Sequence, residues 1–289
     1  MTYHLLLLPG LLFILVFSII PMFGIVMAFQ KYMPSKGIFG SEFVGLKNFR
    51  NLLMFKDVYQ VIANTIIIAV WKIVLSIIVP IFFAILLNEL KYNRLKRAIQ
   101  TVVYLPHFLS WVVIAVIMQN IFSYTGVLNT ITSLFGAEPK MWLVSNTSFR
   151  PIIIISDTWK NYGYNAIIYL AAITGIDPSL YESADIDGAN RMQKIYYITL
   201  PSLKPTIILM ATLSLGSILN AGFEQIFALY TPLVYETGDI IDTYVYRMGL
   251  ERLQYSMSTA VGLAKSMVSA ILIISSYWLA DRFAGYTIF

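Results

Sequence analysis

The chain has 289 residues, of which 58% are hydrophobic and 12% are charged, and its 20 Lys and Arg outnumber its 15 Asp and Glu. A soluble domain carries about twice this charged fraction, so the composition indicates a membrane protein. The lack of cysteine excludes disulfides and thiolate metal sites, and two histidines argue against a metal centre or a His-based catalytic constellation. We therefore expect no metal site, no catalytic residues and no nucleic-acid partner.

A membrane-spanning helix uses about 20 mostly apolar residues, and six stretches of the sequence meet this requirement. They cover residues 5–29, 61–87, 102–122, 152–176, 203–233 and 260–279. No sizeable soluble domain fits beside them, so the sequence predicts an all-α membrane protein with six transmembrane helices, in one transmembrane domain over residues 1–289. Prolines at positions 9, 21, 80 and 106 predict kinked helices, which suit a bundle around a cavity.

The orientation of the spans follows weakly from the basic residues. Their total number on each side does not decide the topology, because the two sides of a model with both ends inside hold nearly equal numbers. Four of them, however, fall in the short segment 88–101, namely Lys91, Arg94, Lys96 and Arg97. This density favours a topology in which both termini are cytoplasmic.

Several ionisable side chains lie within the predicted spans, where they should face protein or a water-filled cavity. Lys72 and Lys265 fall near mid-span and need partners from other helices or an anionic ligand. Asp157 and Lys160 are three residues apart on one helical face. These two residues either neutralise each other as a structural ion pair or belong to a polar pathway through the membrane.

Two predicted spans also carry uncharged polar groups. Tyr164 and Asn165 lie in an aromatic and amide-rich part of the fourth span, which could stack on sugar rings or form an aromatic belt at the interface. Ser217, Asn220 and Glu224 follow one another at helical spacings of three and four in the fifth span. This stripe either lines a pore or holds helices together, and its presence on two spans favours the pore.

The segment between the fourth and fifth spans, residues 177–201, predicts a helix-turn-helix outside the bilayer. Asp177 can cap a helix that has Pro178 in its first turn, and Gly188 permits a sharp turn into a second short helix. Small residues and charges of both signs suit a docking element for a partner protein. An ordinary interfacial loop is the alternative.

The same segment carries a long signature with fixed spacing. Glu182, Ser183 and Ala184 are followed after three residues by Gly188, directly preceded by Asp187, and after nine more by Ile198, Leu200 and Pro201. This pattern resembles the EAA signature, E-A-A-x3-G-x9-I-x-L-P, of permease subunits in binding-protein-dependent ABC importers. The resemblance covers most of the chain and is strongest to the carbohydrate-uptake group, in the subgroup that imports oligosaccharides derived from polysaccharides.

The resemblance implies a transport function and a set of partners. The chain would be the translocation subunit of an ATP-driven importer in the bacterial inner membrane, with a cytoplasmic coupling helix that docks on an ATP-binding subunit. Two such subunits would bind ATP and Mg and hydrolyse ATP, while a second, different permease and an extracytoplasmic sugar-binding protein complete the complex. The chain itself would be no enzyme and would bind no cofactor, in agreement with its lack of a GxxxxGK[ST] phosphate loop.

The resemblance also implies substrate contacts, since Tyr164, Ser217 and Asn220 fall on sugar-contacting positions of the maltose permease. Independently of the resemblance, Lys72 and Lys265, if they face the cavity, would favour an acidic sugar such as a uronate oligomer. The alternative function is an ion-coupled secondary transporter, in which Asp157, Glu224 and the lysines relay protons. Six spans without a clear inverted repeat, and the EAA spacing itself, speak against that alternative.

Overall fold

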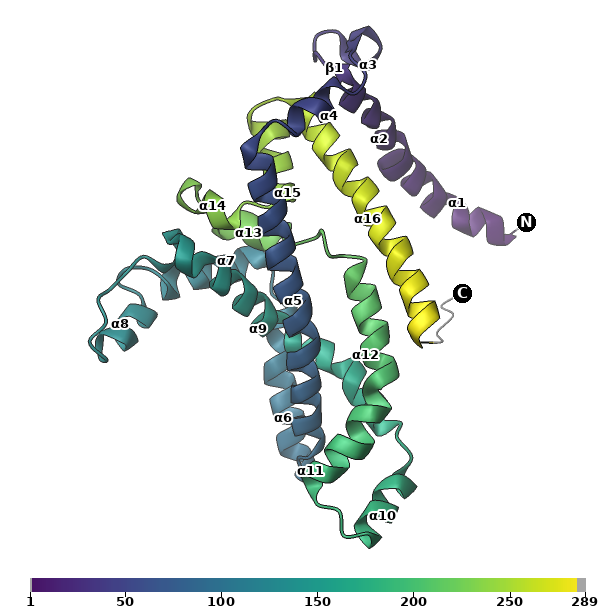
Figure 1. Ribbon diagram of the computed structural model, residues 1–289, viewed down its shortest axis with the longest axis vertical. Helices are drawn as coiled ribbons and strands as arrows, with labels where there is room; N and C mark the ends of the chain where they lie inside the picture. The colour runs from purple at the N-terminus through teal and green to yellow at the C-terminus, as the bar shows by residue number, and fades with distance from the viewer. Residues whose placement is uncertain (1, 285–289) are drawn as a thin grey trace. The chain divides into compact units, whose positions relative to one another are not determined.

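The computed structural model describes residues 2–284, with side chains described for residues 6–278, so the two chain ends that we predicted to be cytoplasmic lie outside the described residues. The predicted all-α class is confirmed (Figure 1), since the described part contains a single two-stranded sheet of β1 (Gln30–Lys31) and β2 (Glu42–Phe43). The chain forms two compact units, Met1–Ile62 with Ile241–Val268, and Ala63–Ile240 with Ser269–Phe289.

The first unit combines the N-terminal part of the chain with residues 241–268. Its elements are α1 (Thr2–Ile14), the π-helical turn η1 (Leu15–Ile19), α2 (Ile20–Met22), the 3₁₀ turn η2 (Phe23–Phe29), β1, α3 (Gly37–Gly40), β2, α4 (Lys47–Leu52), the start of α5 (Lys56–Asn88), α15 (Ile241–Tyr246), η7 (Arg247–Glu251) and the first part of α16 (Tyr255–Ala284). Its core gathers Ala28 and Leu52 around Tyr244, Met248 and Ala260, all buried.

The second unit holds most of the remaining helices. Its elements are most of α5, α6 (Asn93–Tyr104), η3 (Leu105–Phe108), α7 (Trp111–Ile121), α8 (Val127–Ser133), η4 (Trp142–Val144), α9 (Asn146–Thr174), α10 (Pro178–Ile186), α11 (Arg191–Lys194), η5 (Ile195–Thr199), α12 (Leu200–Leu215), α13 (Phe223–Leu229), η6 (Pro232–Val234), α14 (Tyr235–Gly238) and the end of α16. One core cluster surrounds Phe149 and Ile226, and a second surrounds Tyr169 and Leu203.

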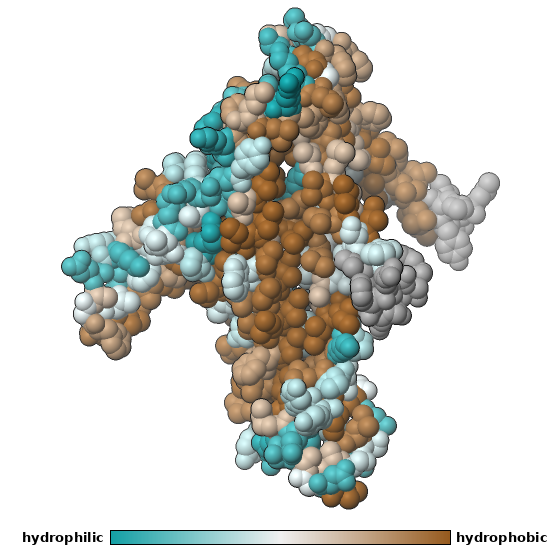
Figure 2. All heavy atoms as spheres, in the orientation of Figure 1, coloured by the Kyte–Doolittle hydropathy of each residue, from teal (hydrophilic) through white to brown (hydrophobic). Residues whose placement is uncertain are grey.

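Much of the apolar surface of these helices is uncovered within the chain, as Figure 2 shows for the face turned to the viewer. Among the described residues, four helices are long and apolar enough to cross a membrane, and a bent pair makes a fifth if it counts as one span. They are Leu6–Phe29, Lys56–Asn88, Arg191–Leu215 and Tyr255–Trp278, with Asn93–Phe108 plus Trp111–Ile121 as the bent pair. The chain is thus a multi-pass membrane protein, and the count of six stays a prediction.

The span predicted over residues 102–122, with a kink at Pro106, is broken into two helices. The chain bends by 101° between Phe108 and Trp111, so that α7 runs nearly perpendicular to α6. Pro106 lies in the 3₁₀ turn at this corner, where it cannot donate a backbone hydrogen bond. A proline in the sequence predicts a kink in the helix, but the size of the bend depends on the tertiary contacts around it. By contrast, α5 continues through Pro80 as a single helix of 33 residues.

The prediction of one helix over residues 203–233 is wrong. Helix α12 ends at Leu215, and α13 begins only at Phe223, after an irregular segment of residues 216–222. Gly222 closes this segment with a φ of +95°, in the left-handed region that favours glycine. Ser217 and Asn220 therefore do not form one helical stripe with Glu224.

The fourth predicted span, residues 152–176, corresponds to α9, which has 29 residues but is too polar to qualify as a span by composition. Its polar groups are accommodated because α9 packs against α6, α12 and α14 instead of standing alone. Gly163 permits the closest approach, since a Cβ at this position would lie 2.6 Å from the carbonyl oxygen of Val103 on α6.

We expect Gly163→Ala to destabilise the protein by about 1–3 kcal/mol, because the new methyl group overlaps the backbone of α6 and must push the two helices apart. Thermal unfolding of the purified protein in detergent measures the effect. Gly175→Ala is the matched control, since Gly175 at the end of α9 has a φ of −87° and its nearest neighbour would lie 3.5 Å from the added Cβ. Equal melting temperatures for the two variants would contradict the close packing of α6 on α9.

Candidate coupling loop and polar pocket

The helix-turn-helix predicted for residues 177–201 is confirmed. The Asp177 carboxylate accepts a hydrogen bond of 2.9 Å from the backbone N–H of Ser179 and caps α10. Gly188 makes the turn with a φ of +76°, and α11 follows. Asn190 and Gln193 form a capping box at its start, with reciprocal hydrogen bonds of 3.0 and 2.7 Å.

Side-chain contacts that the sequence does not reveal brace this loop. An ion pair joins Lys194 to Asp185 across the turn, and the Tyr181 hydroxyl lies 2.9 Å from the Thr199 hydroxyl in η5. Arg191 lies 3.9 Å from Glu89 at the end of α5. These contacts connect the loop to the end of α5 and to η5, which leads into α12.

The signature residues divide into an exposed group and an anchoring group. Those of the exposed group are Glu182, Ser183, Asp187, Gly188 and Pro201, whereas Ala184, Ile198 and Leu200 are half-buried. Leu200 packs against the cluster around Tyr169 and Leu203. Ile186 and Met192 flank the turn with exposed side chains. The loop thus presents a rigid surface of mixed chemistry outside the helix bundle, at the lower end of the second unit in Figure 1.

The cap of α10 has a defined pH dependence. The backbone N–H of Ser179 donates to the Asp177 carboxylate and lowers the pKa of Asp177 below its usual value of 3.8. The cap is therefore fully formed above pH 3.8, and its contribution disappears as the pH falls through the lowered pKa of the folded protein.

At neutral pH we expect Asp177→Ala to loosen α10 because the helix loses the acceptor for an N-terminal amide. Hydrogen exchange of residues 178–186 measures the effect, and Asp177→Ser, which retains a capping oxygen, is the control. If the alanine variant exchanges no faster than the serine variant, the carboxylate does not cap this helix.

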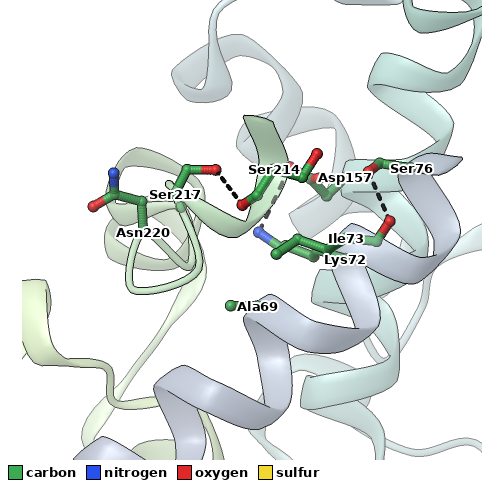
Figure 3. A pocket seen from close by; sticks show the side chains of 9 residues that line it. Ala69, Lys72, Ile73, Ser76, Asp157, Ser214, Ser217 and Asn220 are labelled. Atoms are coloured by element: carbon green, nitrogen blue, oxygen red, sulfur yellow. Dashed lines mark hydrogen bonds and ion pairs between the residues drawn. The ribbon is translucent and has the colours of Figure 1, made fainter. Parts of the chain in front are cut away.

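A polar pocket of about 170 Å³ lies where α5, α9 and the irregular segment after α12 meet (Figure 3). Its lining consists of Ala69, Lys72, Ile73, Ser76, Asp157, Ser214, Ser217, Asn220 and Gly222. The structure thus brings together three of the predicted pathway residues, Lys72, Ser217 and Asn220. It adds Asp157 and two further hydroxyl groups to them.

Lys72 is the centre of the buried network beside this pocket. Its ammonium group, on a residue only 8% exposed, donates to the Ala221 carbonyl at 2.7 Å and to the Gln225 side-chain oxygen at 2.5 Å. The Asp157 carboxylate lies 3.5 Å away and supplies the counter-charge. Gln225 in turn donates to the Ile153 carbonyl at 2.8 Å. Lys72 therefore fastens the irregular segment to α5 and α9.

The geometry explains why residue 222 is a glycine. A Cβ at this position would lie 2.7 Å from the Lys72 ammonium nitrogen, in addition to requiring a left-handed backbone. Sequence reasoning missed the roles of Gly222 and Gln225. A glycine beside the polar residues of the fifth span was the one available signal.

Of the two alternatives for Asp157 and Lys160, the ion pair between them is wrong, whereas Asp157 lines the polar pocket. Asp157 pairs with Lys72, whereas the Lys160 ammonium group donates to the carbonyls of His107 at 2.6 Å and Leu109 at 2.8 Å. These carbonyls lie at the corner between α6 and α7, where the helical hydrogen bonds are interrupted. Lys160 thus satisfies the backbone at the 101° bend, and the two neighbouring charges serve different partners.

The remaining predicted pathway residues do not line the polar pocket. Lys265 forms an ion pair of 2.6 Å with Asp242 in the first unit. Tyr164 is half-exposed and stacks on His107, with ring centroids 3.9 Å apart, while its neighbour Asn165 is half-buried. Glu224 is exposed near the start of α13. Among the described residues, no group of His, Asp or Glu side chains could hold a metal ion.

Comparison with known proteins identifies the family. Residues 76–285 match the family described as the binding-protein-dependent transport system inner membrane component, and the chain belongs to this family. It is 40% identical over 281 residues to the polygalacturonan/rhamnogalacturonan transport system permease protein YteP of Bacillus subtilis, covering 97% of this chain and 88% of that protein. It is 30% identical over 281 residues to the arabinooligosaccharides transport system permease protein AraP of Halalkalibacterium halodurans, covering 95% and 86%.

Solved structures agree with this assignment. A chain from the crystal structure of a bacterial ABC transporter involved in the import of the acidic polysaccharide alginate matches with a TM-score of 0.89 at 37% identity, covering 98% of this chain and 96% of that one. A second structure of a bacterial alginate ABC transporter, in complex with an alginate pentasaccharide-bound periplasmic protein, matches with a TM-score of 0.88. The resemblance to ABC importer permeases found from the loop signature is confirmed.

Proposed function

We propose that this chain is the translocation subunit of an ATP-driven importer that moves oligosaccharides of acidic polysaccharides across the bacterial inner membrane by alternating access. The observation that carries the proposal is the loop of residues 177–201, which combines the EAA spacing with a rigid, exposed helix-turn-helix. A surface that is braced to the ends of both α5 and α12 is suited to pass a partner's movement to the spans.

The partners follow from this loop and from the relatives. Two ATP-binding subunits, which hold ATP and Mg, would dock on coupling loops, one of them on this chain with Glu182 facing basic groups. A second, non-identical permease would complete the pathway, and the loop on the cytoplasmic side would place both termini there too. A structural neighbour crystallised with a periplasmic protein supports an extracytoplasmic binding protein as the donor of the sugar.

The substrate class rests on the relatives and on the pocket. The names of the relatives at 40% and 37% identity point to polygalacturonan, rhamnogalacturonan and alginate, all acidic polysaccharides. Ser217, Asn220 and the Ser214 hydroxyl offer hydrogen bonds to sugar hydroxyls, and Lys72 offers a cation. Tyr164, with one ring face stacked on His107, would offer its other face to a sugar ring, beside Asn165. Glu224 and Lys265, which do not line the polar pocket, would contact the sugar at other points of the translocation pathway.

The proposal is tested by purifying the tagged chain from detergent-solubilised native membranes and identifying its companions by mass spectrometry. We expect two copies of an ATPase, a second permease and a sugar-binding protein. The same complex in proteoliposomes should take up uronate oligosaccharides only with ATP inside. Recovery of this chain alone, active under an ion gradient, would replace the proposal with the secondary transporter.

A further inference from the structure

The loop between α7 and α9 is built as a rigid element. Asn129 on α8 is 2% exposed and ties the loop together through its side-chain amide. Its nitrogen donates to the carbonyls of Ser123, Tyr124 and Lys140 at 2.8–3.0 Å, and its oxygen accepts from the Trp142 indole at 2.8 Å. The hydrogen bonds of Asn129 therefore fix the conformation of the loop, and they lie on the buried face of α8.

The opposite face of α8 is apolar and uncovered within the chain. Val127, Ile131 and Leu134 recur at spacings of four and three and therefore share one face, which Phe135 extends. Their exposed fractions are 61%, 48%, 81% and 86% in that order. No charged residue occurs between positions 121 and 137. We refer to Val127, Ile131, Leu134 and Phe135 as the α8 apolar stripe.

The hydroxyl groups of α8 use their donors within the helix. Thr130 donates to the Gly126 carbonyl at 3.2 Å, Thr132 to the Leu128 carbonyl at 3.0 Å, and Ser133 to the Asn129 carbonyl. A protein interface typically contains about one hydrogen bond per 100–200 Å². A surface whose hydroxyl donors are all used internally is suited to hydrocarbon, where an unsatisfied donor is costly.

The position of α8 along the chain, relative to the loop of residues 177–201, is consistent with a location at the membrane surface. Helix α9 begins shortly after the α8 loop and ends at the coupling loop, and its 29 residues span about 43 Å. This length matches a bilayer including its headgroup regions, about 40–45 Å. The fourth predicted span corresponds to α9, and a helix of this length that crosses the bilayer places the two loops at opposite surfaces of the membrane. In Figures 1 and 2 the segment around α8 projects sideways, with hydrophobic surface on its lower side, toward α10, and hydrophilic surface above.

The residues that flank the stripe are typical of the interface. Lys140 lies over the Trp142 ring at 3.8 Å, and Tyr124 is exposed at the other end of the loop. Aromatic rings and lysines of this kind concentrate at the level of the lipid headgroups. We propose that α8 is an interfacial helix, whose apolar stripe is inserted into the lipid leaflet opposite the coupling loop and which holds the α7–α9 corner at the membrane surface.

The test uses the lack of cysteine in the chain. Single variants Leu134→Cys and Phe135→Cys are labelled with an environment-sensitive fluorophore, and the complete complex, with no reactive cysteine in its other subunits, is reconstituted in phosphatidylethanolamine–phosphatidylglycerol vesicles. We expect spin-labelled lipid to quench both labels several-fold more than aqueous iodide does. Glu138→Cys, in the charged part of the same loop, is the matched control and should show the reverse preference.

Three outcomes would overturn the proposal. Equal quenching of all three labels by iodide would leave the stripe in water. Shielding of positions 134 and 135 from both quenchers in the assembled complex would assign the stripe to a neighbouring subunit. Protection that depends on added sugar-binding protein would assign it to that partner. None of these outcomes depends on transport, so the test is separate from the test of the proposed function.

Discussion

Glu182→Lys is expected to abolish transport by releasing the ATPase, while the permease stays folded in the membrane. Glu182 is exposed on α10 and makes no hydrogen bond or ion pair within the described part of the chain, so its replacement breaks nothing internal. A lysine facing basic groups of the ATPase would replace attraction with repulsion, at a cost of about 2–5 kcal/mol. This cost corresponds to a loss of affinity of roughly 30-fold to several-thousand-fold.

Co-purification of the ATPase with the tagged permease, together with ATP-dependent uptake, measures this effect. Glu138→Lys is the control, because it reverses an exposed charge in the loop at the other end of α9 and should leave assembly intact. Gly188 allows a second comparison, since its positive φ disfavours leucine but tolerates asparagine. Normal transport by both Glu182→Lys and Gly188→Leu would show that this loop does not couple ATP hydrolysis to transport.

Lys72→Met is expected to have the second largest effect, lowering the free energy of unfolding by about 3–5 kcal/mol. The variant leaves the Asp157 carboxylate without its cation and the Ala221 carbonyl without its donor. The segment of residues 216–222 would lose its attachment to α5, so uptake should fall as well. Thermal unfolding in detergent and uptake in proteoliposomes measure the two consequences.

The double variant Lys72→Met with Asp157→Leu separates the two consequences. It removes both charges and should recover much of the stability, whereas uptake should stay low because the bond to Ala221 is still missing. Lys265→Met is the comparison for stability alone, since it breaks a lysine–aspartate pair that does not line the polar pocket. Wild-type stability of Lys72→Met would mean that this lysine does not hold the irregular segment.

The helix-turn-helix of residues 177–201 was predictable from the sequence because its signals are local. An aspartate before a proline starts α10, a glycine ends the turn, and both act through backbone geometry within a few residues. The fold class was predictable for a similar reason, since composition and the length of apolar stretches already identify membrane helices.

The interrupted helices could not be predicted in this way. Residues 203–233 form one apolar stretch, and the break after Leu215 is stabilised by Lys72, which lies far away in the sequence on α5. Likewise, the carbonyls at the corner after Pro106 are satisfied by Lys160 from α9. Charge spacing along one helix suggested a pair of Asp157 with Lys160, but each residue has its partner on a different helix. The partners of these side chains are determined by tertiary packing, which the periodicity of the sequence does not encode.

Under the proposed function, the pairing of Lys72 with Asp157 limits how tightly the polar pocket would hold an acidic sugar. A carboxylate that approaches Lys72 has to compete with one that is already in place, so the exchange of one anion for another yields little net binding energy. A receptor that has to bind its ligand tightly would gain too little affinity from such a pocket. For a site on a pathway the weakness is useful, because a substrate that is held only loosely at each step is free to leave for the next one.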